Sequence, residues 1–141
     1  MMQSILSLNY LAVLVTAVAG FLLGWLWYSP VLFVKPWLAE MKITEEQMKG
    51  AAAKGMAKFL AAGFLCTLLS TFGLAVLIKS HQSPHWLLGA QFGLLVGACV
   101  VGARMLNGGL WEQRSLKLSA INVGHEMALF TLQGAILAVW N

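Results

Sequence analysis

Four long apolar runs constrain the fold of this chain more than any other feature of its sequence. Each run has about 20 residues, the length that an α-helix needs to cross the roughly 30 Å hydrocarbon core of a bilayer. Of the 141 residues, 60% are hydrophobic and only 10% are charged, a balance that is foreign to soluble domains. The runs are continuous and do not alternate with polar residues, so they indicate helices and not a β-barrel. We therefore expect an all-α integral membrane protein, a four-helix bundle in a single transmembrane domain.

The predicted spans cover residues of about 8–28, 59–79, 86–106 and 119–140. We expect the first span to be retained, because no basic residue precedes it and no small-residue cleavage site follows it. The third span is expected to end at Asn107-Gly108-Gly109, a sequence typical of a helix break.

The segment of about 31–58, between the first two spans, has two parts. Its first part, up to Lys42, is too apolar for a free loop and too short to span, so it should lie in the membrane interface, broken at Lys35-Pro36. Thr44 and Gln47 fit a capping box that opens a helix. Because no proline follows before Pro84, we predict one helix from Thr44 to Lys79, roughly 50 Å long, that projects beyond the bilayer. Gly50 and Gly55 are the positions where it would bend.

Small and aromatic residues mark the expected contacts of the spans. Glycines that recur every four residues let helix backbones approach closely, and they predict packing stripes at Gly20 and Gly24, and at Gly89, Gly93 and Gly97. Tryptophan and tyrosine favour the headgroup level, so the expected interfacial anchors are Trp25, Trp27, Tyr28, Trp37 and Trp111.

Basic residues predict the orientation. Lys79 is the basic residue expected on one side of the membrane, and the other side holds Lys35, Lys42, Lys49, Lys54, Lys58, Arg104, Arg114 and Lys117. By the positive-inside rule, the first and third loops are cytoplasmic and both termini lie outside. The net charge of +4 is explained by this asymmetry, and we expect the lipid bilayer and not nucleic acid as the partner.

The fourth span contains Glu126, which cannot lie outside the membrane if the helix is to cross it. A span that began after Glu126 would keep about 15 residues, or roughly 22 Å of helix, which is too short for the bilayer. An ionisable residue at membrane depth is expensive and marks a candidate functional site. Asn122, Glu126 and Gln133 share one helix face by their spacing, and His125 lies beside them.

Three interpretations of this polar group remain open. It is a structural cluster in which Arg104 pairs with Glu126, or a proton- or cation-handling site, or a pocket for a small molecule or lipid headgroup. A metal site formed with Cys66 and Cys99 is disfavoured, because no two ligands have metal-binding spacing within one helix. We expect no cofactor and no enzyme activity, because the sequence has no phosphate-binding loop, nucleophile elbow or metalloprotease motif.

Several stretches together resemble a known family. Asn9-Tyr10-Leu11-Ala12-Val13 fits an N-Y-x-A-V start, and Gly24-Trp25-Leu26-Trp27-Tyr28-Ser29-Pro30 fits a G-x-x-W-Y-x-P end to the first span. With Lys35-Pro36-Trp37 and Ile121-Asn122-Val123-Gly124, they resemble a bacterial domain-of-unknown-function family of small four-span membrane proteins. The resemblance covers nearly the whole chain and implies a location in the bacterial inner membrane, but it supplies no activity.

Two functions fit these observations. The first is an oligomeric transporter or channel, with the path near subunit interfaces, that handles protons, small cations or solutes through Glu126 and His125. The second is a non-catalytic scaffold that binds a protein partner at the projecting part of the second helix, or that binds lipid.

Overall fold

The computed structural model describes residues 2–53, 55–81 and 85–140. Met1, Lys54, residues 82–84 with Pro84, and Asn141 lie outside these ranges. The described residues form helices and no strand, which confirms the all-α prediction. In chain order the helices are α1 (Met2–Leu6), α2 (Tyr10–Trp27), α3 (Val34–Met41), α4 (Glu45–Ala53), α5 (Met56–His81), α6 (Trp86–Leu95), the π-helix η1 (Val96–Gly102), α7 (Ala103–Trp111) and α8 (Leu116–Trp140).

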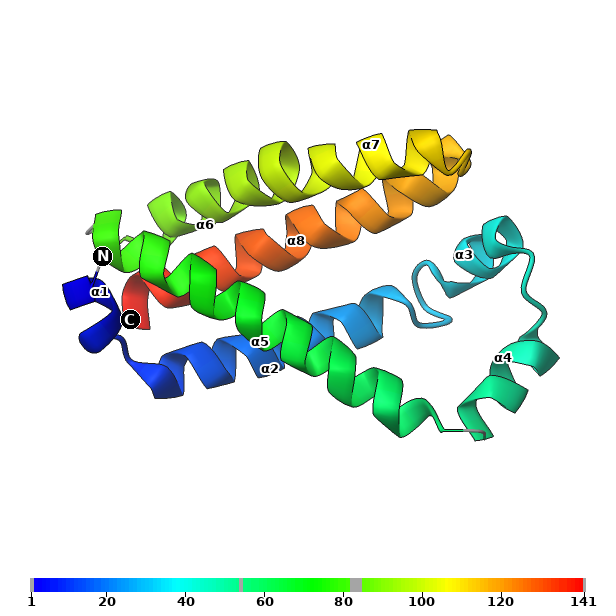
Figure 1. Cartoon of the computed structure of the whole chain (residues 1–141), viewed down its shortest axis with the longest axis horizontal. Coiled ribbons are helices and arrows are strands. Elements are labelled where there is room, and N and C mark those ends of the chain that lie inside the picture. Colours follow the sequence, from blue (N-terminus) through cyan, green and yellow to red (C-terminus); the bar gives the residue numbers. More distant parts are fainter. Residues whose placement is uncertain (1, 54, 82–84, 141) are drawn as a thin grey trace.

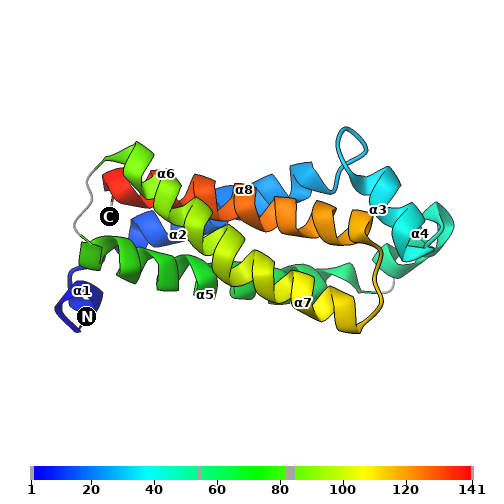
Figure 2. The same ribbon diagram turned by 90° about the horizontal axis from the view of Figure 1, so that it is seen from above.

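Four helical rods are long and apolar enough to cross a membrane: α2, α5, the continuous rod α6–η1–α7, and α8. They run up and down, so both ends of the chain lie at one end of the bundle and α3 and α4 at the other (Figures 1 and 2). The last helix, α8, contacts all three other rods. Large apolar side chains such as Leu22, Leu65 and Leu95 cover the outside, as expected where lipid replaces water as the solvent. The chain is a membrane protein.

Glycines bring the third rod directly against α8. A Cβ atom built on Gly93 would lie 2.0 Å from the carbonyl oxygen of Phe130, and one on Gly89 would lie 2.3 Å from that of Gly134. Gly97 continues the same line beside Glu126. No larger side chain fits at these positions unless the two backbones separate, so this close contact depends on the four-residue glycine spacing.

The buried apolar core of the bundle lies toward the chain termini. Leu74 of α5 and Leu137 of α8 are fully buried there among apolar neighbours from α2 and α8. Asn9 closes this end, because its side chain accepts a hydrogen bond from Ala12 N (3.1 Å) and donates one to Trp140 O (3.2 Å). One residue thus caps α2 and ties it to the end of α8.

The opposite end is held by α3, which docks onto the start of α8. The hydroxyl of Ser115 accepts a hydrogen bond from Leu118 N, which caps α8, and donates to the carboxylate of Glu40. Lys117 lies 3.6 Å from the same carboxylate. The hydrogen bond from Ser115, together with Lys117, lowers the pKa of Glu40. The contribution of this contact is therefore present at neutral pH and is lost as the pH falls through the lowered pKa.

Some predicted boundaries are wrong for identifiable reasons. The capping box is confirmed, since Thr44 N donates to Gln47 Oε1 and Gln47 N donates to Thr44 Oγ1. The single helix from Thr44 to Lys79 is wrong, because Gly55 adopts a φ of 127° that only glycine takes readily, and α4 and α5 are separate.

Two predicted breaks also turn out to lie inside helices. Pro36 falls in the first turn of α3, where its missing N–H costs no hydrogen bond. Asn107-Gly108-Gly109 lies within α7, which continues to Trp111. Gly109 is small for a packing reason, because a Cβ there would come within 2.9 Å of Ser119 Oγ on α8.

Candidate functional site

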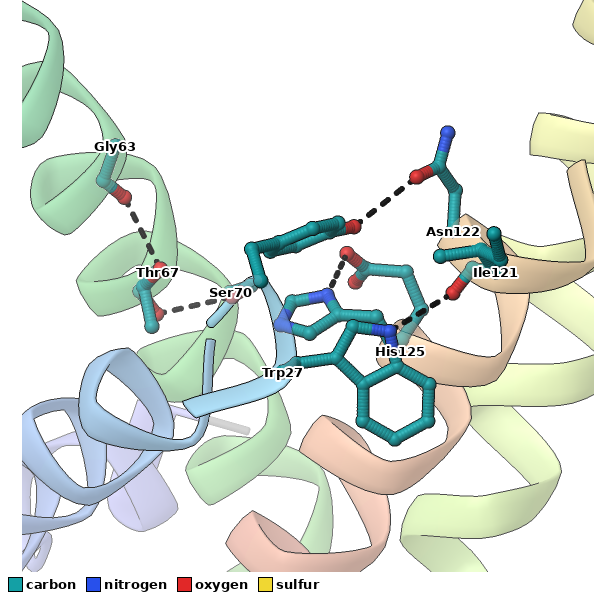
Figure 3. A network of polar contacts seen from close by, with 9 residues as sticks. Trp27, Gly63, Thr67, Ser70, Ile121, Asn122 and His125 are labelled. Atoms are coloured by element: carbon teal, nitrogen blue, oxygen red, sulfur yellow. Dashed lines mark hydrogen bonds and ion pairs between the residues drawn. The ribbon is translucent and has the colours of Figure 1, made fainter. Parts of the chain in front are cut away.

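Two aromatic side chains at the end of α2 form hydrogen bonds with the first half of α8. The indole Nε1 of Trp27 donates a hydrogen bond to the carbonyl of Ile121 (3.1 Å), as Figure 3 shows. The hydroxyl of Tyr28 donates to Asn122 Oδ1 (3.1 Å). The two successive residues therefore bind two successive residues of α8, which fixes the register between the helices.

Two glycines make room for this contact. A Cβ on Gly124 of α8 would lie 3.2 Å from the Trp27 ring, and a Cβ on Gly24 of α2 would lie 3.1 Å from Nε2 of His125. The indole and the imidazole thus each occupy the space that a side chain on the facing helix would take.

His125 lies between these aromatic rings and Glu126. Its ring centroid is 5.2 Å from that of Tyr28 and 6.0 Å from that of Trp27, and its Nδ1 lies 3.1 Å from Oε1 of Glu126. Only 13% of the His125 side chain and 22% of the Glu126 side chain are exposed. When the carboxylate is ionised and the imidazole neutral, Nδ1 carries the hydrogen and Nε2 keeps a free lone pair.

That Nε2 atom is buried and has no hydrogen-bond partner among the described residues. The His125 side chain lines a groove of about 430 Å³ between α2, α5 and α8. The other walls are almost entirely apolar, and the lining comprises Gly20, Phe21, Gly24, Trp25, Tyr28, Met56, Leu60, Gly63, Thr67, His125 and Leu129. Thr67 donates its hydroxyl hydrogen to Gly63 O within α5, whereas the buried Nε2 of His125 has no partner among the described residues.

The groove exists because α5 packs unevenly. The buried residues of α5 are Thr71, Leu74, Ala75, Val76 and Ile78, all in its second half. Its first half touches α2 through an edge-to-face contact between Phe64 and Phe21, with centroids 5.6 Å apart. Gly63 has no Cβ to fill the remaining space. The bundle is consequently tight toward the termini and open toward α3 and α4.

The predicted site residues separate into two groups. Glu126, His125 and Asn122 come together around the end of α2. Gln133 is fully buried two turns further along α8, where its Nε2 donates to Thr71 Oγ1 (2.7 Å) and its Oε1 has no partner among the described residues. The predicted pair of Arg104 with Glu126 is wrong, since the carboxylate contacts His125 and Arg104 is exposed. Arg104 follows the π-helix η1, which rotates later residues away from the face that α-helical counting assigns.

The cysteines do not join this site. Cys66 and Cys99 are both exposed on the outside of the bundle and are not bonded to each other. Within residues 2–53, 55–81 and 85–140, no three His, Cys, Asp or Glu side chains are grouped so that they would hold a metal ion.

A comparison with protein families shows which family this chain belongs to. The family model described as "Protein of unknown function (DUF1761)" matches residues 11–138. The chain belongs to the DUF1761 family. This agrees with the resemblance to a domain-of-unknown-function family. No curated protein and no solved structure gives a significant match.

In this DUF1761 chain, the aromatic residues at the end of the first span have interior roles that their sequence pattern did not signal. Trp27 and Tyr28 fit an interfacial pattern, yet both are half-buried against α8. Trp37 packs on the ring of Tyr28, with centroids 5.8 Å apart, whereas Trp25 and Trp111 are exposed. The facing glycine, Gly124, is the one further sequence signal, because it offers space for a large ring.

Proposed function

We propose that this protein is a small, non-enzymatic membrane transporter that binds and releases a proton at the His125–Glu126 pair. One observation carries the proposal: an ionisable pair lies inside a span, with the second imidazole nitrogen unpartnered beside a groove. Intramembrane acids and histidines form proton relays, because their charge state changes without movement of the backbone. Glu126 orients the ring through Nδ1, which leaves Nε2 as the atom that takes and gives up the proton.

The assembly and orientation complete the proposal. A bundle of this size has little room for an internal path, so we propose a homo-oligomer with the path near the groove and the subunit contacts. The basic residues around α3, α4 and the start of α8 support a cytoplasmic location for that end in a bacterial inner membrane. A scaffold function has less support, because the long projecting helix that suggested it is interrupted at Gly55.

The test is proton entry into lipid vesicles that contain the purified protein and an enclosed pH-sensitive dye. After an external pH drop, we expect Glu126→Gln to slow proton entry about tenfold or more, because glutamine cannot ionise or stabilise a protonated His125. The matched control is Glu112→Gln, which neutralises an acid that is paired with Arg114 at the exposed start of the loop before α8. Equal rates for Glu126→Gln and the unmodified protein would rule out the proposed function.

A further inference from the structure

The groove beside His125 has the chemistry to bind a specific class of ligand. Its volume, about 430 Å³, falls within the range of small-molecule sites, which runs from roughly 300 to 1,000 Å³. Among the described residues, its lining contains no Lys, Arg, Asp or Glu, and it offers aromatic walls at Phe21, Trp25 and Tyr28. Its unpartnered polar atom is Nε2 of His125, which accepts a hydrogen bond when the imidazole is neutral.

We propose that this groove binds a lipophilic amine as its ammonium ion, in competition with the proton of the His125–Glu126 pair. The apolar tail would lie along Leu60 and Leu129, and an ammonium N–H would donate to Nε2. Aromatic faces attract a cation at this position, and the Glu126 carboxylate behind the ring compensates its charge. The inference rests on the proposed function, since it names the substrate class that the same site would carry.

The proton and the ammonium ion compete because both need the single lone pair on Nε2 of His125. When a proton occupies Nε2, that nitrogen becomes a donor and cannot accept from the ammonium ion. When the ammonium ion binds, the proton leaves Nε2 for water, so one positive charge replaces another and no bond in the ligand changes. The titratable group in contact with His125 on α2 is Tyr28, whose ring packs against the imidazole. The part of α5 that lines the groove carries no titratable side chain, and η1 meets the backbone of Glu126 through Gly97.

The experiment measures equilibrium binding of radiolabelled octylamine to the full chain in phosphatidylcholine nanodiscs, corrected with empty nanodiscs. We expect His125→Phe to weaken binding about tenfold or more, because a hydrogen bond to a charged group is lost. Octanol, which has no charge, and octyltrimethylammonium, which has no N–H, should each bind about tenfold more weakly than octylamine. In a weakly buffered sample at a pH where the pair holds the extra proton, octylamine binding should release about one proton.

Glycines of α5 supply a matched pair of steric variants. Gly63→Leu places a side chain in the groove and should abolish octylamine binding. Gly73→Leu adds the same side chain to the exposed face of α5, where nothing lies within 4 Å of its Cβ, and should leave binding unchanged. If Gly63→Leu does not fold, Gly63→Ala gives a graded reduction, because its Cβ makes only ordinary contact with Phe21 at 3.9 Å.

The outcomes separate this inference from the proposed function. Equal binding of octylamine and octyltrimethylammonium, or no effect of His125→Phe, would mean that the groove is a plain apolar site and would overturn the inference. If that happens while Glu126→Gln still slows proton entry, the proposed function stands and the substrate class is wrong. If octylamine binds as expected but Glu126→Gln leaves proton entry unchanged, the groove is a binding site and the transport proposal fails.

Discussion

Replacing Gly93 by alanine is expected to destabilise the bundle by about 3 kcal/mol or more, the upper range for overpacking a close contact. A Cβ at this position would lie 2.0 Å from the carbonyl oxygen of Phe130 and 2.7 Å from its carbonyl carbon. These are backbone atoms of α8, so no side-chain rotation relieves the clash and the two helices must separate. Separation would also disturb the neighbouring contact of Gly89 with Gly134, because the same rods make both. Unfolding in mixed detergent micelles, followed by far-ultraviolet circular dichroism, measures the loss.

Gly108→Ala is the matched control for that change. Gly108 belongs to the same rod, but a Cβ there meets nothing within 4 Å, and alanine favours a helix over glycine by roughly 1 kcal/mol. We therefore expect Gly108→Ala to be neutral or slightly stabilising. If both variants lose the same stability, the close contact of α6 with α8 does not hold the bundle together.

The architecture could be predicted from the sequence because it depends on run lengths and spacings along the chain. The length of the apolar runs determines how many helices can span, and the spacing of Gly89, Gly93 and Gly97 defines a face without reference to any partner. What the spacing does not contain is the partner itself, which is Phe130 and Gly134 on α8. Local chemistry was also legible, as the capping box at Thr44 and Gln47 illustrates.

Predictions failed where the backbone leaves regular helical geometry. The break at Gly55 depends on a left-handed conformation that glycine permits but does not require, so the sequence could only offer it as a bend. The predicted pair of Arg104 with Glu126 assumed that the long Arg104 side chain reaches the carboxylate. The π-helical turn before Arg104 changes which face later residues occupy, and Arg104 is exposed while Glu126 contacts His125.

The candidate site was predicted in part. Glu126 stands out because a carboxylate in a span is rare, and His125 is adjacent to it in sequence. The position of Gln133 on the same helical face suggested a shared cluster. However, Asn122 and His125 contact Tyr28 at the end of α2, whereas Gln133 packs against Gly20 further back on α2 and donates to Thr71 of α5. Such a division depends on how helices cross, which spacing along one helix does not determine.

Three buried polar atoms on α2 and α8 have no hydrogen-bond partner among the described residues. These atoms are Thr16 Oγ1, Gln133 Oε1 and His125 Nε2, and Gly20 and Gly24 lie directly against the last two side chains. Buried polar atoms without partners are costly.

Trp27→Ala is expected to cost about 2–3 kcal/mol of stability, less than the roughly 3–5 kcal/mol for a fully buried aromatic side chain, because Trp27 is half-buried. The change removes the hydrogen bond to Ile121 O, the contact with Gly124 and the tilted ring contact with Phe33. It also removes one of the two aromatic rings that contact His125, so the variant should bind octylamine more weakly as well as lose stability. Detergent-induced unfolding measures the first effect, and octylamine binding in nanodiscs measures the second.

Trp25→Ala separates the effect on stability from the effect on octylamine binding, because Trp25 lies on the same helix but is 74% exposed. We expect its effect on unfolding to stay within about 0.5 kcal/mol, as for surface positions in general. Since Trp25 lines the groove, its loss should still weaken octylamine binding. If Trp25→Ala destabilised the bundle as much as Trp27→Ala, the tryptophans at the end of α2 would stabilise the protein by contact with lipid and not by contact with α8. A large difference in stability instead requires the inward contacts of Trp27, which hold His125 in place against Gly24.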